Sequence, residues 1–221
     1  MLSRITLPHD DYITTRSHHH SHVPNLMSSH RGKLIVISAP SGSGKTTIAK
    51  AVLQHHPSIV FSVSATTRPI RTGEVEGKDY FFLTSEEFEA KVQQGDLVEW
   101  EEIYGNYYGT LKSEIDRALS AGKVMLFDVD VKGALSIKKH YPEALLIFIK
   151  TPDVQTLKER LTNRKTEDDG TLKRRLERVP MELNLGEQFD YRVVNDNLQK
   201  AITEVEAIIK EQMQRESIHS L

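Results

Sequence analysis

A short loop between two regular segments carries residue types that suit phosphate binding. Residues 39–47 read A-P-S-G-S-G-K-T-T, between an apolar run at 34–37 and a segment with helical character at 45–55. Backbone N–H groups of such a loop can converge on phosphate oxygens at a helix N-terminus, because the partial positive charge there favours an anion. Lys45 would reach the terminal phosphates, and the Thr46 hydroxyl would bind Mg²⁺. The loop predicts a site for the phosphates of a nucleoside triphosphate.

The phosphate-loop pattern is complete except at its first position, where Ala39 stands in place of glycine. The alternative is a Gly/Ser turn that binds nothing, but the flanking apolar run and helix favour the binding loop. The residues expected to contact ATP are Ala39, Pro40, Ser41, Gly42, Ser43, Gly44, Lys45, Thr46 and Thr47.

A second group of polar residues lies between residues 61 and 110. Arg68 and Arg71 are three positions apart, and Tyr80 follows them. Two guanidinium groups and a phenol could clamp a second phosphate through charge-assisted hydrogen bonds. Taken singly, such an arginine is commonly a solvated charge and such a tyrosine commonly half-buried packing. The grouping is what indicates a second phosphate site.

The elements that must position these residues alternate between strand and helix, which predicts an α/β, doubly wound core of the P-loop NTPase type with a parallel sheet and flanking helices. Strands are expected at 34–37, 124–129, 144–149 and 191–194, and helices at 45–55, 111–119, 132–140, 153–161 and 172–183. The last helix should pack through Leu198, Ile202, Val205, Ile208 and Ile209.

The segment 61–110 interrupts this alternation with short strands and turns, which predicts a small mixed α/β lobe with antiparallel strands. Thr84 and Glu87 have the spacing of a capping box, Phe88 and Val92 share one helix face, and Gly95 ends the helix. The expected division is therefore a core of 31–60, 111–150 and 187–221, a lobe of 61–110 and a further segment of 151–186 that is rich in arginine.

Composition describes an ordinary globular chain. Of 221 residues, 38% are hydrophobic and 27% charged, and the formal net charge of −2 gives no long-range attraction to nucleic acid or to an anionic membrane. No apolar run is long enough to cross a membrane, and there is no cysteine, which together favour the cytoplasm. Residues 1–30 hold six of the ten histidines without periodicity, which predicts a disordered leader in preference to a metal site, with Met27 as a candidate start.

Seven stretches of the chain, covering about residues 32–212, closely resemble the guanylate kinase family. In chain order they read S-A-P-S-G-S-G-K-T-T, F-S-V-S-A-T-T-R-P-I-R-T-G-E, G-K-D-Y-F-F, L-V-E-W, G-N-Y-Y-G-T, D-V-D-V-K-G and R-V-V-N-D. A phosphate loop alone is shared by many nucleoside triphosphatases, whereas the paired arginines together with G-N-Y-Y-G-T are specific to this group. The resemblance implies Mg²⁺-dependent transfer of a phosphoryl group from ATP to GMP, with ATP and GMP as substrates.

The resemblance also implies a role for each matching position in the lobe. Arg68, Arg71, Tyr80 and Tyr108 would hold the GMP phosphate, and Ser64, Glu99, Thr110 and Asp130 would face the guanine, with Asp128 close by. Guanine presents N–H donors at N1 and at its 2-amino group, so one ionised carboxylate can accept both, whereas adenine has an acceptor at N1. From the residues alone, Asp128 and Asp130 follow a buried strand, where a carboxylate can orient magnesium-bound water or a bound nucleotide. The alternatives are a surface carboxylate at Glu99 and a helix cap at Asp130.

From the residues alone, the arginine-rich segment 151–186 would be a solvated charged face, whereas the resemblance implies that it is a lid region that closes over ATP. The lid would supply Arg160, Arg164 and Arg175 to the transferring phosphoryl group, with Lys45 and Arg68 completing the catalytic set. Asn195 would hold the adenine end of ATP, or else serve only as a turn residue. Two positions depart from the family pattern: Lys165 replaces a usual glycine and Lys132 a usual glutamine.

Two alternatives to the GMP kinase remain open at this point. One is a noncatalytic guanylate-kinase-like module that binds proteins through the same cleft. The other is a related kinase for another phosphorylated sugar or nucleotide. The complete Gly-Ser-Gly-Lys-Thr run argues against the first, and both arginines with G-N-Y-Y-G-T argue against the second.

Overall fold

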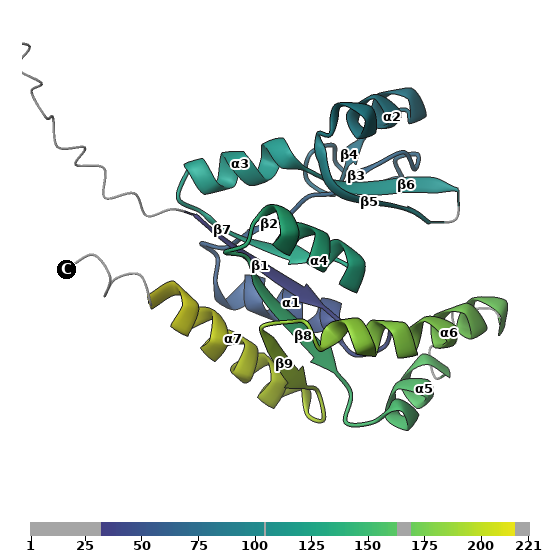
Figure 1. The fold of residues 1–221 in the computed structure, drawn as a ribbon, viewed down its shortest axis with the longest axis vertical. Helices are drawn as coiled ribbons and strands as arrows, with labels where there is room; N and C mark the ends of the chain where they lie inside the picture. Colours follow the sequence, from purple (N-terminus) through teal and green to yellow (C-terminus); the bar gives the residue numbers. More distant parts are fainter. Residues whose placement is uncertain (1–31, 104, 163–168, 215–221) are drawn as a thin grey trace, which may run out of the picture.

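A five-stranded parallel sheet forms the centre of the molecule (Figure 1). The computed structural model describes residues 32–103, 105–162 and 169–214. The strands follow the order β2-β7-β1-β8-β9, and every neighbouring pair is parallel. Their bounds are β1 Lys33–Ser38, β2 Val60–Phe61, β7 Val124–Asp128, β8 Leu145–Lys150 and β9 Tyr191–Val194. The predicted parallel α/β core is confirmed.

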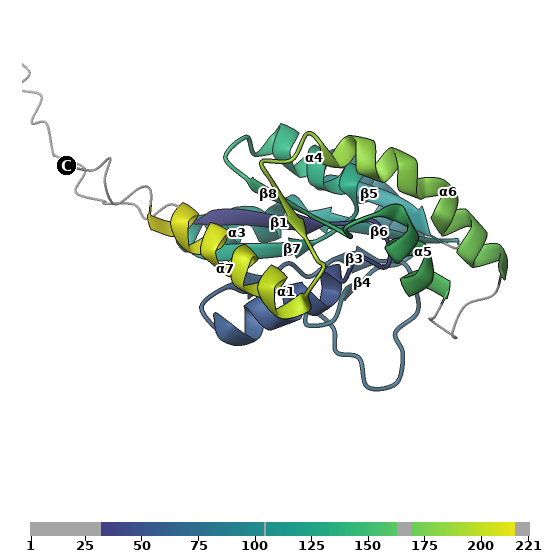
Figure 2. The same ribbon diagram turned by 90° about the horizontal axis from the view of Figure 1, so that it is seen from below.

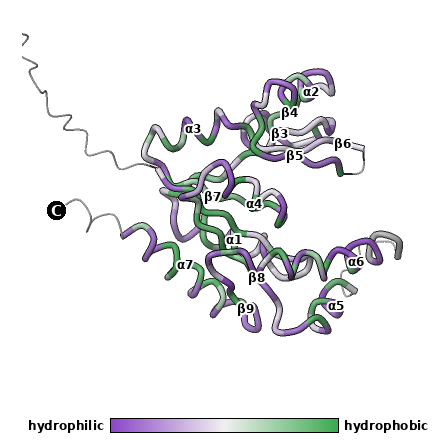
Figure 3. The backbone as a smooth tube through the Cα atoms, viewed as in Figure 1, coloured by the Kyte–Doolittle hydropathy of each residue, from purple (hydrophilic) through white to green (hydrophobic). Residues whose placement is uncertain are grey.

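Both faces of this sheet are covered by helices, as expected for parallel strands with apolar residues on both sides. Alternate residues of β1 enter two separate cores: Ile35 and Ile37 pack with α1 (Lys45–His55) and α7 (Leu198–Gln214), whereas Leu34 and Val36 pack with α3 (Lys112–Ser120) and α4 (Val131–His140). Figure 2 shows α1 and α7 on one side of the sheet and α4 on the other, and Figure 3 shows the apolar residues gathered between the layers.

The final helix packs much as its apolar stripe predicts. Ala201, Ile202, Val205 and Ile209 are buried, and Ile208 is partly buried against the same core. Leu198 differs, because its side chain is 42% exposed. It is the first residue of α7, so it lies at the end of the helix instead of over the sheet.

The lobe contains a second sheet, with strand order β4-β3-β6-β5. Its elements are β3 Ala65–Thr66, β4 Phe81–Phe82, α2 Ser85–Gln94, β5 Leu97–Ile103 and β6 Asn106–Leu111. The expectation of purely antiparallel strands is wrong in one pair: β3 and β4 run parallel, because the long connection between them lets the chain return to the same end of the sheet. Phe61 also belongs to the core sheet, where it pairs with Leu126.

The predicted capping box at the start of α2 is confirmed. The Thr84 side chain accepts a hydrogen bond from the Glu87 N–H, and the Glu87 carboxylate accepts one from the Thr84 N–H. Gly95 ends the helix with φ 72°, a left-handed conformation that glycine adopts without a Cβ clash. Phe88 is thereby held in the small core of the lobe.

Thr84→Ala should therefore lower the free energy of unfolding by about 1 kcal/mol, because an N–H of the first turn loses its acceptor. Urea denaturation followed by circular dichroism measures the change. Thr84→Ser should keep most of the stability, since it retains the hydroxyl, and Thr203→Ala on the exposed face of α7 is a control for the loss of a threonine elsewhere. Equal losses in Thr84→Ser and Thr84→Ala would contradict the capping role.

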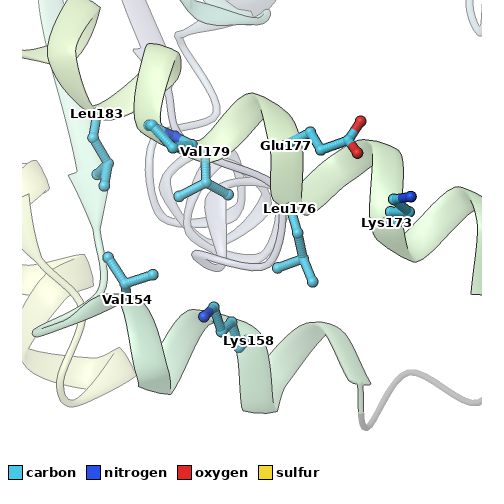
Figure 4. Close-up of a pocket in the computed structure, with 8 residues that line it drawn as sticks. Val154, Lys158, Lys173, Leu176, Glu177, Val179 and Leu183 are labelled. Atoms are coloured by element: carbon cyan, nitrogen blue, oxygen red, sulfur yellow. The ribbon is translucent and has the colours of Figure 1, made fainter.

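The lid region consists of two helices that project from the core on the same side as the lobe (Figure 1). They are α5 Val154–Thr162 and α6 Asp169–Gly186. Leu157 and Leu161 of α5 pack against Val179 of α6. Figure 4 shows Val154, Leu176 and Val179 facing a cavity of about 780 Å³ between the two helices. Within the part of the chain that the structure describes, no helix has the length and apolar character to cross a bilayer.

Candidate functional site

The phosphate loop turns sharply from β1 into α1. Gly42 and Gly44 have φ values of 91° and 94°, which only glycine adopts easily. Gly44 is the N-cap of α1 and provides no side-chain acceptor, so the first-turn N–H groups of the helix have no side-chain cap. This arrangement suits an anion at the helix N-terminus. The Ser43 N–H, expected among the phosphate donors, instead donates to the Pro40 carbonyl at 3.1 Å.

The first position of the loop, Ala39, lies at the end of β1 and is buried. Its side chain joins the core cluster that contains Ile37 and Ile48. The Ala39 side chain therefore packs in the core, and Ala39 also lines the cavity over the loop.

Lys45 and Thr46 both contact Asp128, which ends β7. The Lys45 ammonium forms an ion pair with the Asp128 carboxylate, and Thr46 Oγ1 donates to Asp128 Oδ2 at 3.0 Å. The register explains this contact, because Ile37 at the end of β1 lies opposite Asp128. Asp128, expected either close to the guanine or as a residue that orients magnesium-bound water, contacts the phosphate loop in this structure. A hydroxyl and a carboxylate are the kinds of oxygen ligand that Mg²⁺ prefers.

Lys45 is surrounded by carboxylates in a largely buried place. Burial lowers the pKa of its ammonium to about 8, while the charges of Asp130 and Glu182 act in the opposite direction. Burial also raises the pKa of Glu182, an effect that the nearby Arg178 opposes. Because burial disfavours the charged form of Lys45 and nearby negative charge favours it, a negatively charged ligand at the loop would stabilise the protonated ammonium.

Asp130 has two partners. Its Oδ1 accepts a hydrogen bond from the Gly133 N–H at 2.8 Å, which makes Asp130 the N-cap of α4, as the alternative interpretation expected. Its Oδ2 accepts one from Arg178 Nη2 of α6 at 3.0 Å. Arg178 also lies 3.3 Å from Glu101 Oε1 of β5. One guanidinium therefore joins the lid helix to the core and to the lobe.

Glu99 and Thr110 face each other across the lobe sheet. Their strands pair with Glu99 opposite Thr110, and Thr110 Oγ1 donates to Glu99 Oε1 at 2.6 Å. A Cβ placed on Gly133 would lie 3.2 Å from Glu99 Oε2 and 3.2 Å from Asp130 Oδ1, so both carboxylates border the start of α4. Burial raises the pKa of Glu99, an effect that its bond from Thr110 opposes. The structure thus brings together three of the residues predicted to face guanine.

The fourth of these, Ser64, immediately precedes β3. Its carbonyl accepts a hydrogen bond from the Phe81 N–H at 2.9 Å, which joins the start of β3 to β4.

The predicted monophosphate residues gather around Arg68. The Arg68 guanidinium lies 5.2 Å from the centroid of the Tyr80 ring, and the Tyr80 and Tyr108 ring centroids are 6.0 Å apart. Glu74, which sequence reasoning missed, accepts two hydrogen bonds from Arg68 at 3.0 and 2.7 Å and one from the Arg71 N–H at 2.8 Å. A single carboxylate thereby fixes both arginine positions, and the Arg68 side chain lowers the pKa of Glu74. The spacing of Glu74, three residues after Arg71, is the feature of the sequence that could have indicated this contact.

Two of the predicted lid arginines form hydrogen bonds, one with the phosphate loop and one with Asn195. Arg175 Nη1 donates to Ser41 Oγ at 2.9 Å, and Arg160 Nη2 donates to the Asn195 carbonyl at 3.0 Å. Arg164 and Lys165 lie outside the described residues, as does the predicted leader. Arg178, one helical turn after Arg175, was not among the predicted site residues.

A cavity of about 320 Å³ lies over the phosphate loop. Lys45 and Thr46 line one side of it, and Glu101, Asp130 and Arg178 line the rest together with Glu182 and neighbouring residues. Glu101 and Glu99 are two residues apart on β5, so their side chains point to the same face of the lobe sheet. Of the residues predicted to face guanine, Asp130 lines this cavity, and Glu101 of the lobe lines it as well.

The family model "Guanylate kinase" matches residues 31–212. Guanylate kinase of Chlorobium luteolum is 50% identical over 179 residues, which are 80% of this chain and 89% of that protein. Guanylate kinase of Thermotoga maritima is 45% identical over 180 residues, 81% of this chain and 87% of that protein.

A solved structure agrees with these sequence matches. The crystal structure of guanylate kinase from Anaplasma phagocytophilum superposes with a TM-score of 0.64 and 30% sequence identity, covering 83% of this chain and 87% of that chain. Both the family model and the close relatives span nearly all of the described residues. The chain therefore belongs to the guanylate kinase family.

Proposed function

We propose that this chain transfers the terminal phosphoryl group of ATP to GMP, giving ADP and GDP. Membership of the guanylate kinase family supports this activity. The observation that carries it on this chain is the cavity over the phosphate loop, which Lys45 lines together with Glu101 of the lobe, the same lobe that holds Arg68 and Glu99. A kinase acting on two nucleotides needs these two subsites, whereas a nucleoside triphosphatase needs only the first.

Phosphoryl transfer between two bound phosphates requires alignment, neutralisation of charge and exclusion of water, and it needs no nucleophilic side chain. Lys45 and the α1 N-terminus would hold the ATP phosphates. Arg175 and Arg160, with Arg164, would stabilise the charge that spreads over the phosphoryl group in the transition state. The contacts of Arg175 with Ser41 and of Arg160 with Asn195 support this assignment.

The donor set around Thr46 fits Mg²⁺. Thr46 Oγ1 and the Asp128 carboxylate supply hard oxygen ligands within hydrogen-bond distance of each other, next to the lysine that would bind the phosphates. When bound with ATP, the ion would neutralise phosphate charge. Thr46 would hold it directly, and Asp128 would orient its water, one of the two roles that the sequence left open for this carboxylate.

GMP would bind across the lobe. Arg68, Arg71, Tyr80 and Tyr108 would hold its phosphate. Glu99 would accept hydrogen bonds from guanine N1 and the 2-amino group, with Ser64, Thr110 and Asp130 around the base. The bond from Thr110 to Glu99 supports this role, because it leaves the second carboxylate oxygen, Oε2, toward Asp130 at the start of α4.

The experiment that tests the function is a coupled assay of ADP release with ATP, Mg²⁺ and one nucleoside monophosphate at a time. GMP is expected to support turnover, with AMP, UMP and CMP far less effective. Equal turnover with AMP would overturn the guanine assignment. ATP binding without ADP release would favour the noncatalytic module, and a preference for a different phosphorylated acceptor would favour the related kinase.

A further inference from the structure

Asn195 lies beneath the phosphate loop, at the end of β9. Asn195 is buried, with 4% of its surface exposed, and its side-chain Nδ2 donates a hydrogen bond to the Ser43 carbonyl at 2.8 Å. Its own N–H donates to the Lys150 carbonyl at 2.7 Å, and its carbonyl accepts from Arg160 Nη2 at 3.0 Å. One residue is thus bonded to the end of β8, to the phosphate loop and to α5.

The bond to Ser43 fixes the orientation of one peptide group in the loop. A peptide bond is planar, and in the trans form its carbonyl and its N–H point in opposite directions. Because Asn195 holds the Ser43 carbonyl on the buried side, the Gly44 N–H of the same peptide group is directed to the other side. Gly44 and Lys45 line the cavity over the loop, where the phosphates of ATP would lie.

Asn195 lies close against the backbone of the loop at Gly44. A Cβ on Gly44 would lie 2.4 Å from Asn195 Nδ2, a distance at which something must shift. Since the Ser43 N–H is already donated to the Pro40 carbonyl, the Gly44 N–H is one of the loop donors that remain for phosphate. The orientation that Asn195 imposes is therefore relevant to binding.

We propose that Asn195 is a positioning residue for the triphosphate, acting through the Ser43–Gly44 peptide group, and that it is not a contact to adenine. The proposal rests on the proposed function, because it assumes that the loop binds the phosphates of ATP. A positioning role and a contact to adenine predict different effects on ligands that lack the base. A residue that orients the loop affects every ligand carrying the triphosphate, with or without adenine.

Binding measured by calorimetry tests this with three probes: a non-hydrolysable ATP analogue, inorganic tripolyphosphate with Mg²⁺, and GMP. Asn195→Ala is expected to raise the dissociation constants of the ATP analogue and of tripolyphosphate by the same factor, about 5- to 10-fold, as for loss of one hydrogen bond. The GMP dissociation constant should stay within about twofold, because its donors lie on the lobe. Asn197→Ala is the matched control, since Asn197 caps α7 from the same turn without contacting the loop.

A loss confined to the ATP analogue, with tripolyphosphate binding unchanged, would overturn the proposal in favour of an adenine contact. Unchanged binding of both probes would also overturn it. Asn195→Asp is a second variant of the same size; it places a carboxylate oxygen against the Ser43 carbonyl and should weaken tripolyphosphate binding at least as much.

The wild-type protein provides a measurement that needs no variant. The amide resonance of Gly44 should shift on addition of tripolyphosphate, and an unshifted resonance at saturation would contradict the proposed orientation. Failure of the proposed function is distinguishable, because it would appear as absent GMP turnover in the wild-type assay, whatever the behaviour of Asn195 variants.

Discussion

Lys45→Met is expected to abolish phosphoryl transfer, with a fall in kcat of about 10³-fold or more, the scale seen when a charge-stabilising donor is removed from an active site. Lys45 is the cation at the phosphate loop, where it contacts Asp128 and lines the cavity over α1. Methionine keeps most of the apolar stem and removes the ammonium. The assay of ADP release measures the effect.

GMP binding should be largely intact in the same variant, because the proposed donors for its phosphate, Arg68 and Arg71, belong to the lobe. Lys50→Met on the exposed side of α1 is the control for loss of a lysine from this helix. Retained transfer in Lys45→Met would contradict the role of the loop lysine. Loss of GMP binding would contradict the independence of the two subsites.

Glu99→Ala is expected to reduce the preference for GMP over AMP by about 10²-fold or more, since a site built to hydrogen-bond one base can discriminate by about 10⁴ to 10⁵. The carboxylate is held by Thr110 and lies beside Asp130 at the start of α4. The measurement is kcat/KM for GMP and for AMP in each protein. Glu102→Ala is the matched control on the same strand, because Glu102 is exposed and points to the opposite face. An unchanged preference would contradict the guanine role of Glu99.

The pH dependence tests the same carboxylate. Burial raises the pKa of Glu99 above its usual value, so Glu99 becomes protonated at a higher pH than an ordinary carboxyl as the pH falls. A protonated carboxyl accepts one of the two guanine N–H groups poorly, and kcat/KM for GMP should therefore decline on the acid side through that raised pKa. Glu99→Gln should lose this acid limb. An identical acid limb in Glu99→Gln would assign it to another group.

Features that depend on neighbouring residues were predictable from the sequence. The phosphate loop, the helix at 45–55 and the capping box at Thr84 each arise within a few residues, and the structure has all three. The parallel core followed from apolar runs that alternate with helical segments. Family resemblance predicted that Glu99, Thr110 and Asp130 face the guanine. The positions of Glu99 and Thr110 opposite each other follow from strand register.

Features that depend on distant contacts were not predictable in this way. For Asp128 the sequence left open a place close to the guanine and a role in orienting magnesium-bound water, and its contacts with Lys45 and Thr46 depend on strand register. The contacts of Arg178 with Asp130 and Glu101 depend on where α6 lies relative to α4 and β5. Asn195 is buried because β9 ends beside the phosphate loop. The residues next to Asn195 in the sequence do not predict this contact.

The measurement that tests the central claim most directly is a crystal structure with GMP and a non-hydrolysable ATP analogue bound together. We predict the triphosphate on the loop at Gly44 and Lys45, the GMP phosphate at Arg68 and Arg71, and the guanine on Glu99, with the two phosphate groups facing each other across the cleft. A guanine base bound away from Glu99, or a GMP phosphate that occupies the loop at Lys45, would contradict the account.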